Sequence, residues 1–511
     1  MRRFRSLLLV GLVLLAIVAA VFLSTATRLS PTVRDRIISA LNERFASRVD
    51  VESLQVGVFP RPELSGSNLS VRWDGRTDVP PLVRLGNFSA SAGLYGLLGT
   101  PVSLKTVHLD RLEIHIPPGG VKVSGDTAPA KNGNARLLID EIVAHAAELQ
   151  IASKDPAKLP RVFEIHDLHI FEFGRQDGAE FRALLTNPKP EGRIETRGRF
   201  GPWQKEEPRR TPIRGEYTFK NANLDTIKGL GGILASRGRY TGPLERIEVA
   251  GETETPDFSI DVAGQPVPLT TKFEAVVDGT NGNTWLEKVD ARLLESHIHA
   301  RGAVVRTKDV KGRTVELDIT IDNARIEDLL KLAVKGSKPP LTGAVKVKTK
   351  FLLPAGPADV VERLQLAGEF ALEQARFTNF NVQRRLSSLS QRAQGDETPE
   401  DGESVVSQLR GNFTLKDSAL RFSDLRFAMP GAAVELVGSY NLQSEALDFA
   451  GHVLLDVALR DTTSGFKAVL ATMAQPFFRR PGGGSKLPIK IAGTREKPQF
   501  GLDVKRALLP G

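Results

Sequence analysis

Histidines stand in pairs at two places in this 511-residue chain, and histidines beside carboxylates are common ligands of metal ions. His166 and His169 form the first pair, and His297 and His299 form the second. The first histidine of each pair stands two residues after a glutamate. Residues three apart on a strand point to opposite faces of the sheet, which separates the first pair. His297 and His299 share a face but have no third ligand nearby in the sequence. We therefore interpret all four as histidines on the wet face of strands and predict no metal site.

The sequence shows no other motif of catalysis. The glycines at Gly231-Gly232 and at Gly482 to Gly484 lack the glycine-lysine-serine or threonine ending of a phosphate-binding loop. The sequence also lacks the serine nucleophile elbow and the zinc-protease helix motif. Its carboxylates are spaced as the alternation of strands already predicts, so none of them stands out as a catalytic pair. The absence of cysteine excludes thiolate catalysis and disulfides. We predict that the protein is not an enzyme and uses no cofactor.

The net charge of +9 and the pI of about 9.6 raise the question of nucleic-acid binding. Lysine and arginine are spread along the chain, and Trp73, Trp203 and Trp285 are too far apart to form a stacking platform. We therefore predict no nucleic-acid partner. Anionic lipid headgroups are one expected counter-charge, and a generally solvated basic surface is the alternative.

The N-terminus has the pattern of a membrane anchor. Three arginines among the first five residues precede an uncharged apolar run from Leu7 to Leu23. As a helix this run is about 26 Å long, close to the ~30 Å of a bilayer core. The positive-inside rule sends the chain from Arg28 onward across the membrane. A signal peptide cleaved near Ser24-Thr25-Ala26 is the alternative, but the run exceeds the usual signal core, which favours the anchor.

Most of the remaining chain alternates between apolar and polar residues, as strands with one buried face do. From Val315 to Ile321, aliphatic residues alternate with acidic residues and threonine, and Val345, Val347 and Phe351 alternate with three lysines. Few helices are available for parallel crossovers, so we predict a mainly antiparallel sheet. Similar runs occur at residues 104–116, 162–173, 409–415 and 432–442.

Amphipathic helices are predicted near both ends of the strand region. One begins at Pro31 and continues to Phe45, where it would lie on the membrane or cap a sheet end. The other runs from Phe466 to Phe477 and would cover the last sheet edge. Three segments without pattern are predicted to be loops: residues 117–135, 203–212 and 391–404.

Two sequence patterns occur twice and in the same order. Residues 221–225 (Asn-Ala-Asn-Leu-Asp) are echoed by residues 323–327 (Asn-Ala-Arg-Ile-Glu), each typical of a strand end that enters a short helix. Residues 244–252 are echoed by residues 361–369. Ordered matches of this kind predict stacked modules that bury their faces against neighbours. The apolar faces must be covered by a second sheet, as in a sandwich, or by a ligand.

Several short motifs follow one another in a characteristic order. In the N-terminal half they lie at residues 33–45, 48–51, 56–62, 69–71, 94–98 and 107–114. In the C-terminal region they lie at residues 420–425, 430–438 and 487–494. The order of these motifs resembles that of the AsmA family of bacterial envelope proteins. The resemblance covers about half of the chain, and its motifs mark a fold rather than a catalytic site.

The resemblance implies an inner-membrane, single-pass protein whose main body lies in the periplasm as an elongated, curled antiparallel β-sheet groove built of repeated modules. It also implies a relation to bridge-like lipid carriers and a role in outer-membrane lipid and protein assembly. We expect six segments, which are an anchor (1–27), an AsmA-like N-terminal region (28–116), a β segment with loops (117–210), duplicated β modules (211–390), an acidic loop (391–404) and an AsmA-like C-terminal region (405–511).

Two functions are therefore expected as alternatives. In the first, the protein handles phospholipid or another acyl lipid without catalysis, and acyl chains lie on inward-facing aliphatic residues. In the second, a tethered scaffold with a closed core assists outer-membrane protein assembly through sheet edges and an envelope protein partner. The candidate lipid-contacting residues are Leu317, Ile319, Val345, Val347, Leu364 and Leu366.

Overall fold

The structure is a computed structural model. It describes residues 48–57, 63–72, 80–81, 83–93, 102–116, 137–151, 161–202, 204, 207–262, 265–307, 310, 312–336, 338–378, 407–455 and 485–502. The expected anchor, both expected amphipathic helices and the expected loops at 117–135 and 391–404 lie outside these residues. Within the described ranges, none of the helices combines the length and the apolar character needed to span a bilayer.

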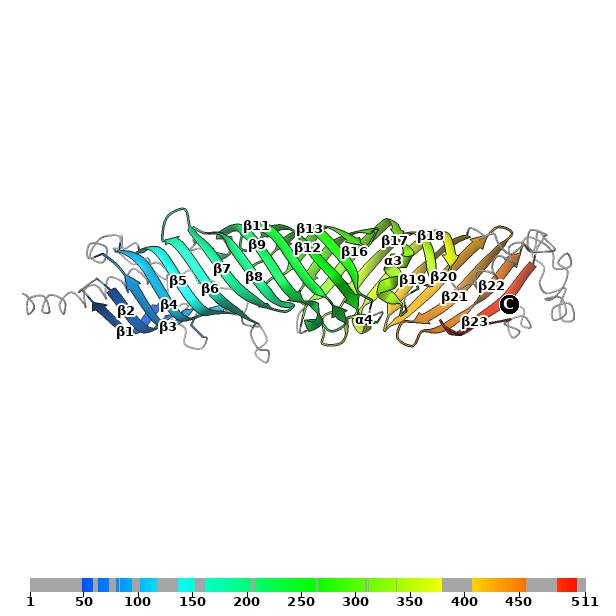
Figure 1. Ribbon diagram of the computed structural model, residues 1–511, viewed down its shortest axis with the longest axis horizontal. Coiled ribbons are helices and arrows are strands. Elements are labelled where there is room, and N and C mark those ends of the chain that lie inside the picture. The colour runs from blue at the N-terminus through cyan, green and yellow to red at the C-terminus, as the bar shows by residue number, and fades with distance from the viewer. Residues whose placement is uncertain are drawn as a thin grey trace, which may run out of the picture. The chain divides into compact units, whose positions relative to one another are not determined.

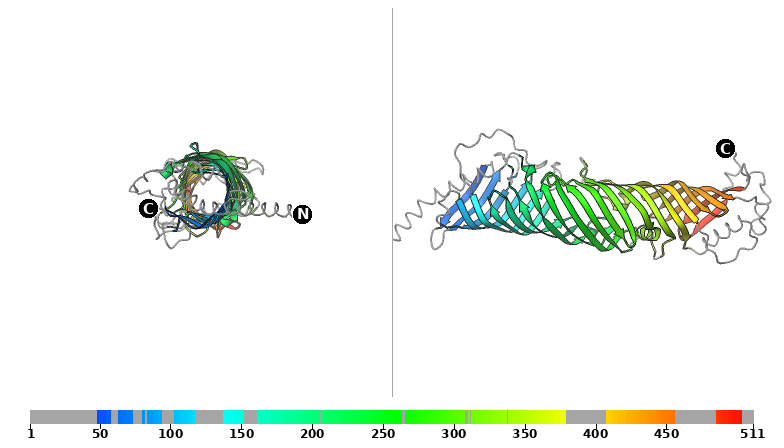
Figure 2. Two further views of the ribbon diagram at one scale, coloured as in Figure 1. Left: turned by 90° about the vertical axis from the view of Figure 1, so that its left-hand side faces the viewer. Right: turned by 90° about the horizontal axis from the view of Figure 1, so that it is seen from above.

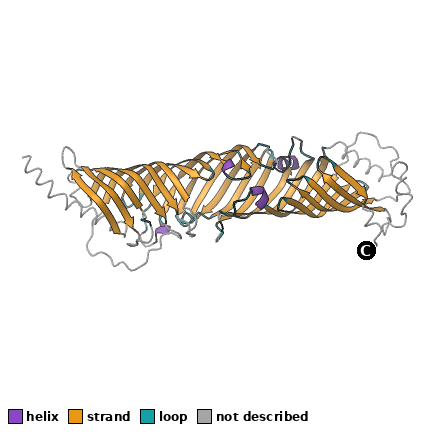
Figure 3. Cartoon of the chain, turned by 90° about the horizontal axis from the view of Figure 1, so that it is seen from below, coloured by secondary structure: helices purple, strands orange, loops and turns teal. Residues whose placement is uncertain are grey.

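The described chain is mainly β, as the alternating pattern predicts, and forms one large open sheet of 24 strands (Figures 1 and 3). The first eight strands are β1 (Arg48–Gly57), β2 (Glu63–Arg72), β3 (Val83–Ser91), β4 (Val102–Ile116), β5 (Leu137–Ile151), β6 (Arg161–Phe173), β7 (Ala179–Pro188) and β8 (Glu191–Phe200). The next eight are β9 (Pro212–Asn223), β10 (Leu230–Gly231), β11 (Ile233–Pro243), β12 (Ile247–Ile260), β13 (Val267–Val277), β14 (Thr284–Leu293), β15 (Ser296–Val305) and β16 (Thr314–Arg325). The last eight are β17 (Leu341–Leu353), β18 (Gln365–Phe377), β19 (Ser407–Lys416), β20 (Ala419–Met429), β21 (Ala432–Asn441), β22 (Ala446–Leu455), β23 (Ser485–Thr494) and β24 (Pro498–Leu502).

Helices are short in the described residues. The helical elements are η2 (Pro208–Arg210), η3 (Leu224–Thr226), α3 (Ile326–Ala333) and α4 (Val360–Arg363). Both copies of the first repeated pattern have the expected local structure, because η3 follows β9 directly and α3 follows β16 directly. In the second pattern the copies differ: a turn precedes β12, whereas α4 precedes β18.

Pairing is antiparallel in nearly every strand pair whose register is defined, and consecutive strands are neighbours except around the two-residue β10, which pairs with β12 while β9 pairs with β11. The exception to antiparallel pairing is the pair β4–β5, which is parallel over its whole length, from Val102 beside Leu137 to Ile116 beside Ile151. The residues that connect these two strands lie outside the described ranges. The sequence does not distinguish this parallel pair from an antiparallel one, because alternation of apolar and polar residues along a strand does not depend on the direction of its neighbour.

The chain divides into two compact units. The first contains residues 1–221, 237–249 and 277–282, and the second contains residues 222–236, 250–276 and 283–511. In each unit the strands twist progressively and the sheet curves (Figure 2). Each unit also has its own clusters of buried side chains.

Two buried clusters of the first unit, called the N-terminal clusters, lie on strands β2–β6. One contains Leu64, Leu104 and Ile142, and the other contains Leu85 and Ile165 among its members. Residues directly opposite each other on neighbouring strands share a face, and burial of that face stabilises each fully covered aliphatic side chain by about 1.5–3 kcal/mol. Strands β8 and β9 contribute no member to these clusters.

One buried cluster of the second unit, called the C-terminal cluster, draws its buried residues from β16–β18 and β20–β23. Its centre is a single row of directly opposed side chains, which we call the sealed row. Phenylalanines on the same face add ring contacts, such as Phe370 with Phe422 at 6.1 Å between centroids and Phe377 with Phe427 at 5.7 Å. The sealed row consists of Ala324, Val345, Leu372, Leu409, Phe427, Val434, Val453 and Leu487.

Candidate functional site

A second row of side chains lies on the same face of the second unit and is separated from the sealed row on β17 by Val347 and Thr349. Leu317 of β16 lies opposite Phe351 of β17, and Phe351 lies opposite Leu366 of β18. These three side chains, called the open row, are only half-buried and belong to none of the three clusters of the described residues. The open row is therefore an apolar surface that other side chains of the described protein do not cover completely.

The six candidate lipid-contacting residues are divided between these rows. Val345 belongs to the sealed row and is only 1% exposed. Ile319 and Val347 are half-buried and pack against the C-terminal cluster. Leu317 and Leu366 form part of the open row, whereas Leu364 is the half-buried residue that ends α4. The structure thus brings five of the six onto one face and places Leu364 just before the strand that carries Leu366.

In the first unit, side chains from two strands meet across a third. The hydroxyl of Thr196 on β8 lies 2.7 Å from the hydroxyl of Tyr240 on β11, and Gly215 of β9 lies beneath the tyrosine ring. Burial raises the pKa of Tyr240, although its hydrogen bond with Thr196 opposes this shift. Side chains two strands apart approach this closely because the sheet is concave there and the intervening residue has no side chain. The lack of a side chain at Gly215 therefore allows Tyr240 to reach Thr196 across β9.

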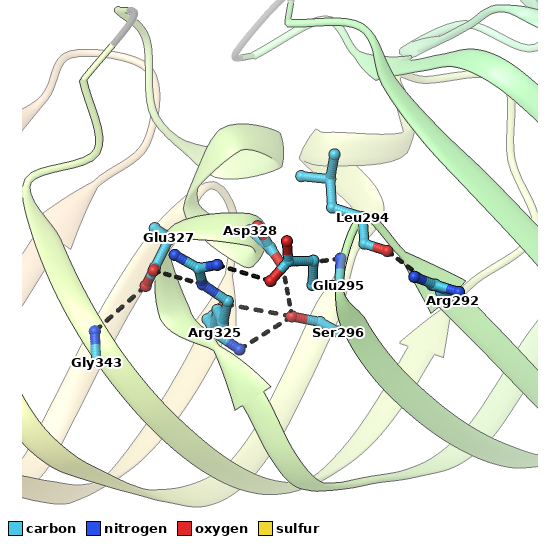
Figure 4. A network of polar contacts seen from close by, with 8 residues as sticks. All are labelled: Arg292, Leu294, Glu295, Ser296, Arg325, Glu327, Asp328 and Gly343. Carbon is cyan, nitrogen blue, oxygen red and sulfur yellow. Dashed lines mark hydrogen bonds and ion pairs between the residues drawn. The ribbon is translucent and has the colours of Figure 1, made fainter.

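Helix α3 lies at the end of the apolar face of the second unit, where Ile326 and Leu329 pack against the C-terminal cluster. A polar network holds the start of the helix (Figure 4). The hydroxyl of Ser296 donates to the buried Asp328 carboxylate at 2.8 Å and accepts from the Arg325 main-chain N–H at 3.0 Å. These bonds satisfy the buried polar atoms and fix α3 to β15 and β16.

The same network includes an ion pair between Arg325 and Glu327. Arg325 bonds Glu327 at 2.8 Å, and the Gly343 N–H donates to the same carboxylate at 3.2 Å. Burial is the largest single influence on the pKa of Glu327 and would raise it. The bonds from its own N–H, from Arg325 and from Gly343 together outweigh burial, so the pKa of Glu327 lies below its usual value.

We therefore expect Glu327 to stabilise the fold at neutral pH and to lose this contribution in acid. A carboxyl group whose folded-state pKa is lowered contributes stability above its unfolded pKa, near 4.5, and loses it as the pH falls through the folded value. In Glu327→Gln, the melting temperature should fall at pH 7 and should change less than that of the wild type between pH 5 and pH 3. Thermal melts of both proteins across this range measure the difference, and Glu316→Gln, at an exposed position of β16, is the control. Parallel pH profiles for Glu327→Gln and the wild type would contradict the assignment.

The opposite face of the sheet carries charged and polar side chains. His169 lies 3.0 Å from Glu141 and 3.3 Å from Asp167, and His299 lies 2.7 Å from Asp290. His166 lies 2.7 Å from the Thr186 hydroxyl and takes no part in the His169 contacts. No group of three or more histidine or carboxylate side chains in the described ranges is placed to hold a metal ion. The histidines of this face act as partners of neighbouring polar groups.

The first unit also contains a cavity of about 730 Å³ at one end of its strands. Its walls come from the turn after β6, the end of β8, the start of β9 and the end of β11. The segment 203–212, expected to be a loop, contributes η2 and its Arg210 to this wall. The lining residues are Asp177, Arg199, Gly201, Arg210, Pro212, Ile213, Arg214, Thr241, Gly242, Pro243 and Glu245. Sequence reasoning missed this site, because its residues lie on four separate segments and match no motif.

No protein-family model matches the chain, and no curated protein matches it either. The functional interpretation therefore depends on the residues of the protein itself.

Proposed function

We propose that the protein handles phospholipid, or another acyl lipid, without catalysis, and that the acyl chains lie on the apolar face of the second unit. The observation that carries the proposal is the open row, where Leu317, Phe351 and Leu366 are only half-buried, whereas most side chains of the sealed row are fully buried. Exposed apolar surface of this kind is costly in water unless a ligand or partner covers it. An acyl chain has the extended form and the chemistry to cover a row of this kind.

The energetics of such binding need no polar contact to the chain. Each methylene group removed from water contributes about 0.8 kcal/mol, so about ten buried methylenes provide several kcal/mol even after the cost of immobilisation. Lipid headgroups can stay near the strand ends, where charged residues are frequent. This arrangement would form an elongated, curled groove built of repeated modules.

We further propose that the chain is AsmA-like and is anchored in the inner membrane with its main body in the periplasm. The arginines before the apolar run at residues 7–23 and the ordered motifs of the two terminal regions support this location. A role in outer-membrane homeostasis would follow from lipid handling at this place.

The first test is to identify the lipid that the full-length protein retains. The protein is purified in a mild detergent and analysed by native mass spectrometry, with a tagged protein of similar size as the control for carry-over. We expect phospholipid at about one or more molecules per chain. A folded wild-type protein without lipid would contradict the proposal and would favour the scaffold that contacts envelope proteins through its sheet edges.

Leu366→Asp should reduce the retained lipid several-fold and leave the protein folded. The new carboxylate would lie in the open row, where it is half-exposed and can stay hydrated, but it would repel an acyl chain. Ala367→Asp is a matched control, because residue 367 is the next residue on β18 and is exposed on the opposite face. Lipid phosphorus per mole of protein measures retention, and circular dichroism measures folding. Equal lipid in the two folded variants would remove the open row from the proposed site.

A further inference from the structure

The cavity at the strand ends of the first unit has the properties of a binding site that the apolar face does not explain. Its volume of about 730 Å³ is within the range of small-molecule pockets, roughly 300–1,000 Å³. It combines three arginines and two carboxylates with the half-buried Ile213. A cavity that presents charges of both signs beside an apolar side chain favours a polar ligand with an apolar continuation.

Main-chain hydrogen bonds fix the walls of this cavity. The Leu244 N–H donates to the Thr211 carbonyl at 3.0 Å, and the Glu245 N–H donates to the Arg209 carbonyl at 2.9 Å. A further bond joins the Gly201 N–H to the Pro212 carbonyl at 2.8 Å. Thr211, at the centre of these contacts, is completely buried. The cavity is therefore preformed, which lowers the entropic cost of binding a ligand.

Two of the three arginines already have carboxylate partners. Arg199 bonds Glu180 at 2.9 Å, and Arg210 lies 2.6 Å from Glu207 and 3.8 Å from Glu245. These pairs compensate the charges of Arg199 and Arg210 and hold their side chains in the cavity wall.

Arg214 and Asp177 differ from these arginines. Neither side chain makes an ion pair within 4 Å or a hydrogen bond with any residue that the structure describes, although Asp177 is close enough to Arg199 to interact with its charge, and both line the cavity. The Asp177 main-chain carbonyl does accept a bond from Arg199 at 3.4 Å, which fixes the turn that carries the carboxylate. Among the described residues, the cavity thus offers one cation, from β9, and one anion, from the turn before β7, that take part in no ion pair within 4 Å.

We propose that this cavity binds a zwitterion made of a phosphate and an ammonium group, such as the phosphoethanolamine headgroup of a lipid. The phosphate pairs with the Arg214 guanidinium, and the ammonium pairs with the Asp177 carboxylate, with Glu245 as the second acid nearby. A simple anion bound at Arg214 would leave the Asp177 carboxylate without a partner, and a simple cation bound at Asp177 would leave the Arg214 guanidinium without one. Only a ligand with both charges completes the site.

This inference extends the proposed function by naming the headgroup, but the cavity can also accept the free zwitterion. Three probes separate these sources when titrated by calorimetry into the full-length protein at low ionic strength. Glycerophosphoethanolamine carries the zwitterion alone, dihexanoylphosphatidylethanolamine adds short acyl chains, and dihexanoylphosphatidylglycerol has chains with an anionic headgroup.

We expect both ethanolamine probes to bind, and to bind at least about tenfold more weakly to Arg214→Gln and to Asp177→Asn, because each variant loses one charge-assisted hydrogen bond. Arg193→Gln is the matched control, since Arg193 lies at the other end of β8 and does not line the cavity. Both Arg214 and Asp177 are exposed, so the substitutions should leave folding intact.

The outcomes distinguish this inference from the proposed function. Binding of glycerophosphoethanolamine that depends on Arg214 and Asp177 supports the cavity, even if the protein retains no acyl lipid. Stronger binding of the ethanolamine lipid than of the free zwitterion identifies a lipid headgroup as the ligand. Lipid retention without preference between the ethanolamine and glycerol headgroups, together with no binding of the free zwitterion, would overturn the inference and leave the apolar face as the lipid site. Equal affinities of wild type, Arg214→Gln and Asp177→Asn would overturn it as well.

Discussion

A chain with Val345→Asp is expected not to form a stable fold. Val345 is 1% exposed and lies between Ala324 of β16 and Leu372 of β18, which are 3% and 1% exposed. An aspartate there would place a carboxylate among aliphatic side chains with no partner to compensate its charge. Losses of more than about 4 kcal/mol are typical of an unpaired buried charge, which is a large part of the 5–15 kcal/mol that stabilises most domains.

The measurement is the soluble yield and the chemical unfolding curve of the full-length protein. Ala344→Asp is the matched control, since residue 344 is adjacent in the sequence, is exposed on the other face and lies opposite Arg325. We expect near-normal stability for this control. A folded Val345→Asp protein that loses less than about 1 kcal/mol would show that the sealed row is open to water or lipid.

Gly215→Ala should destabilise the first unit and separate Thr196 from Tyr240. A Cβ atom at residue 215 would lie 2.5 Å from the Tyr240 hydroxyl and even closer to the Arg197 main-chain carbonyl oxygen. The tyrosine ring can rotate away, but the carbonyl belongs to the neighbouring strand and cannot move without distorting the sheet. We expect a loss of about 1–3 kcal/mol, the usual cost of overpacking a well-filled site.

Thermal unfolding followed by circular dichroism measures this loss, and the near-ultraviolet tyrosine signal reports the displaced ring. Gly93→Ala is the control, because a Cβ atom there would meet no other atom within 4 Å. If Gly215→Ala melted at the same temperature as Gly93→Ala, this result would contradict the close packing of Tyr240 against Gly215 of β9.

The cavity and the open row would contact chemically different parts of a ligand. The open row contacts only apolar groups, whereas the cavity presents Arg214 and Asp177 to charged ones. Lipid content and headgroup preference are therefore separate measurements, and variants at the two places should change one without the other.

The sequence by itself determined the type of those strands whose apolar and polar residues alternate, and which of their side chains share a face. Alternation from Val315 to Ile321 and from Val345 to Phe351 reports local geometry, since successive side chains on a strand point to opposite faces whatever the neighbouring strands are. The step from strand to short helix after residues 221–223 and 323–325 was predictable for the same reason, because the signal lies within a few residues.

Tertiary structure alone decided which apolar side chains are covered. Val345 and Leu366 have the same pattern in the sequence, but Val345 is sealed because Phe427, Val434 and other residues of its cluster come from strands about a hundred residues away. The cavity likewise depends on segments that meet only when the sheet forms, so no local motif marks Asp177 or Arg214. Burial and charge compensation are properties of the assembled sheet, and the order of residues along one strand does not contain them.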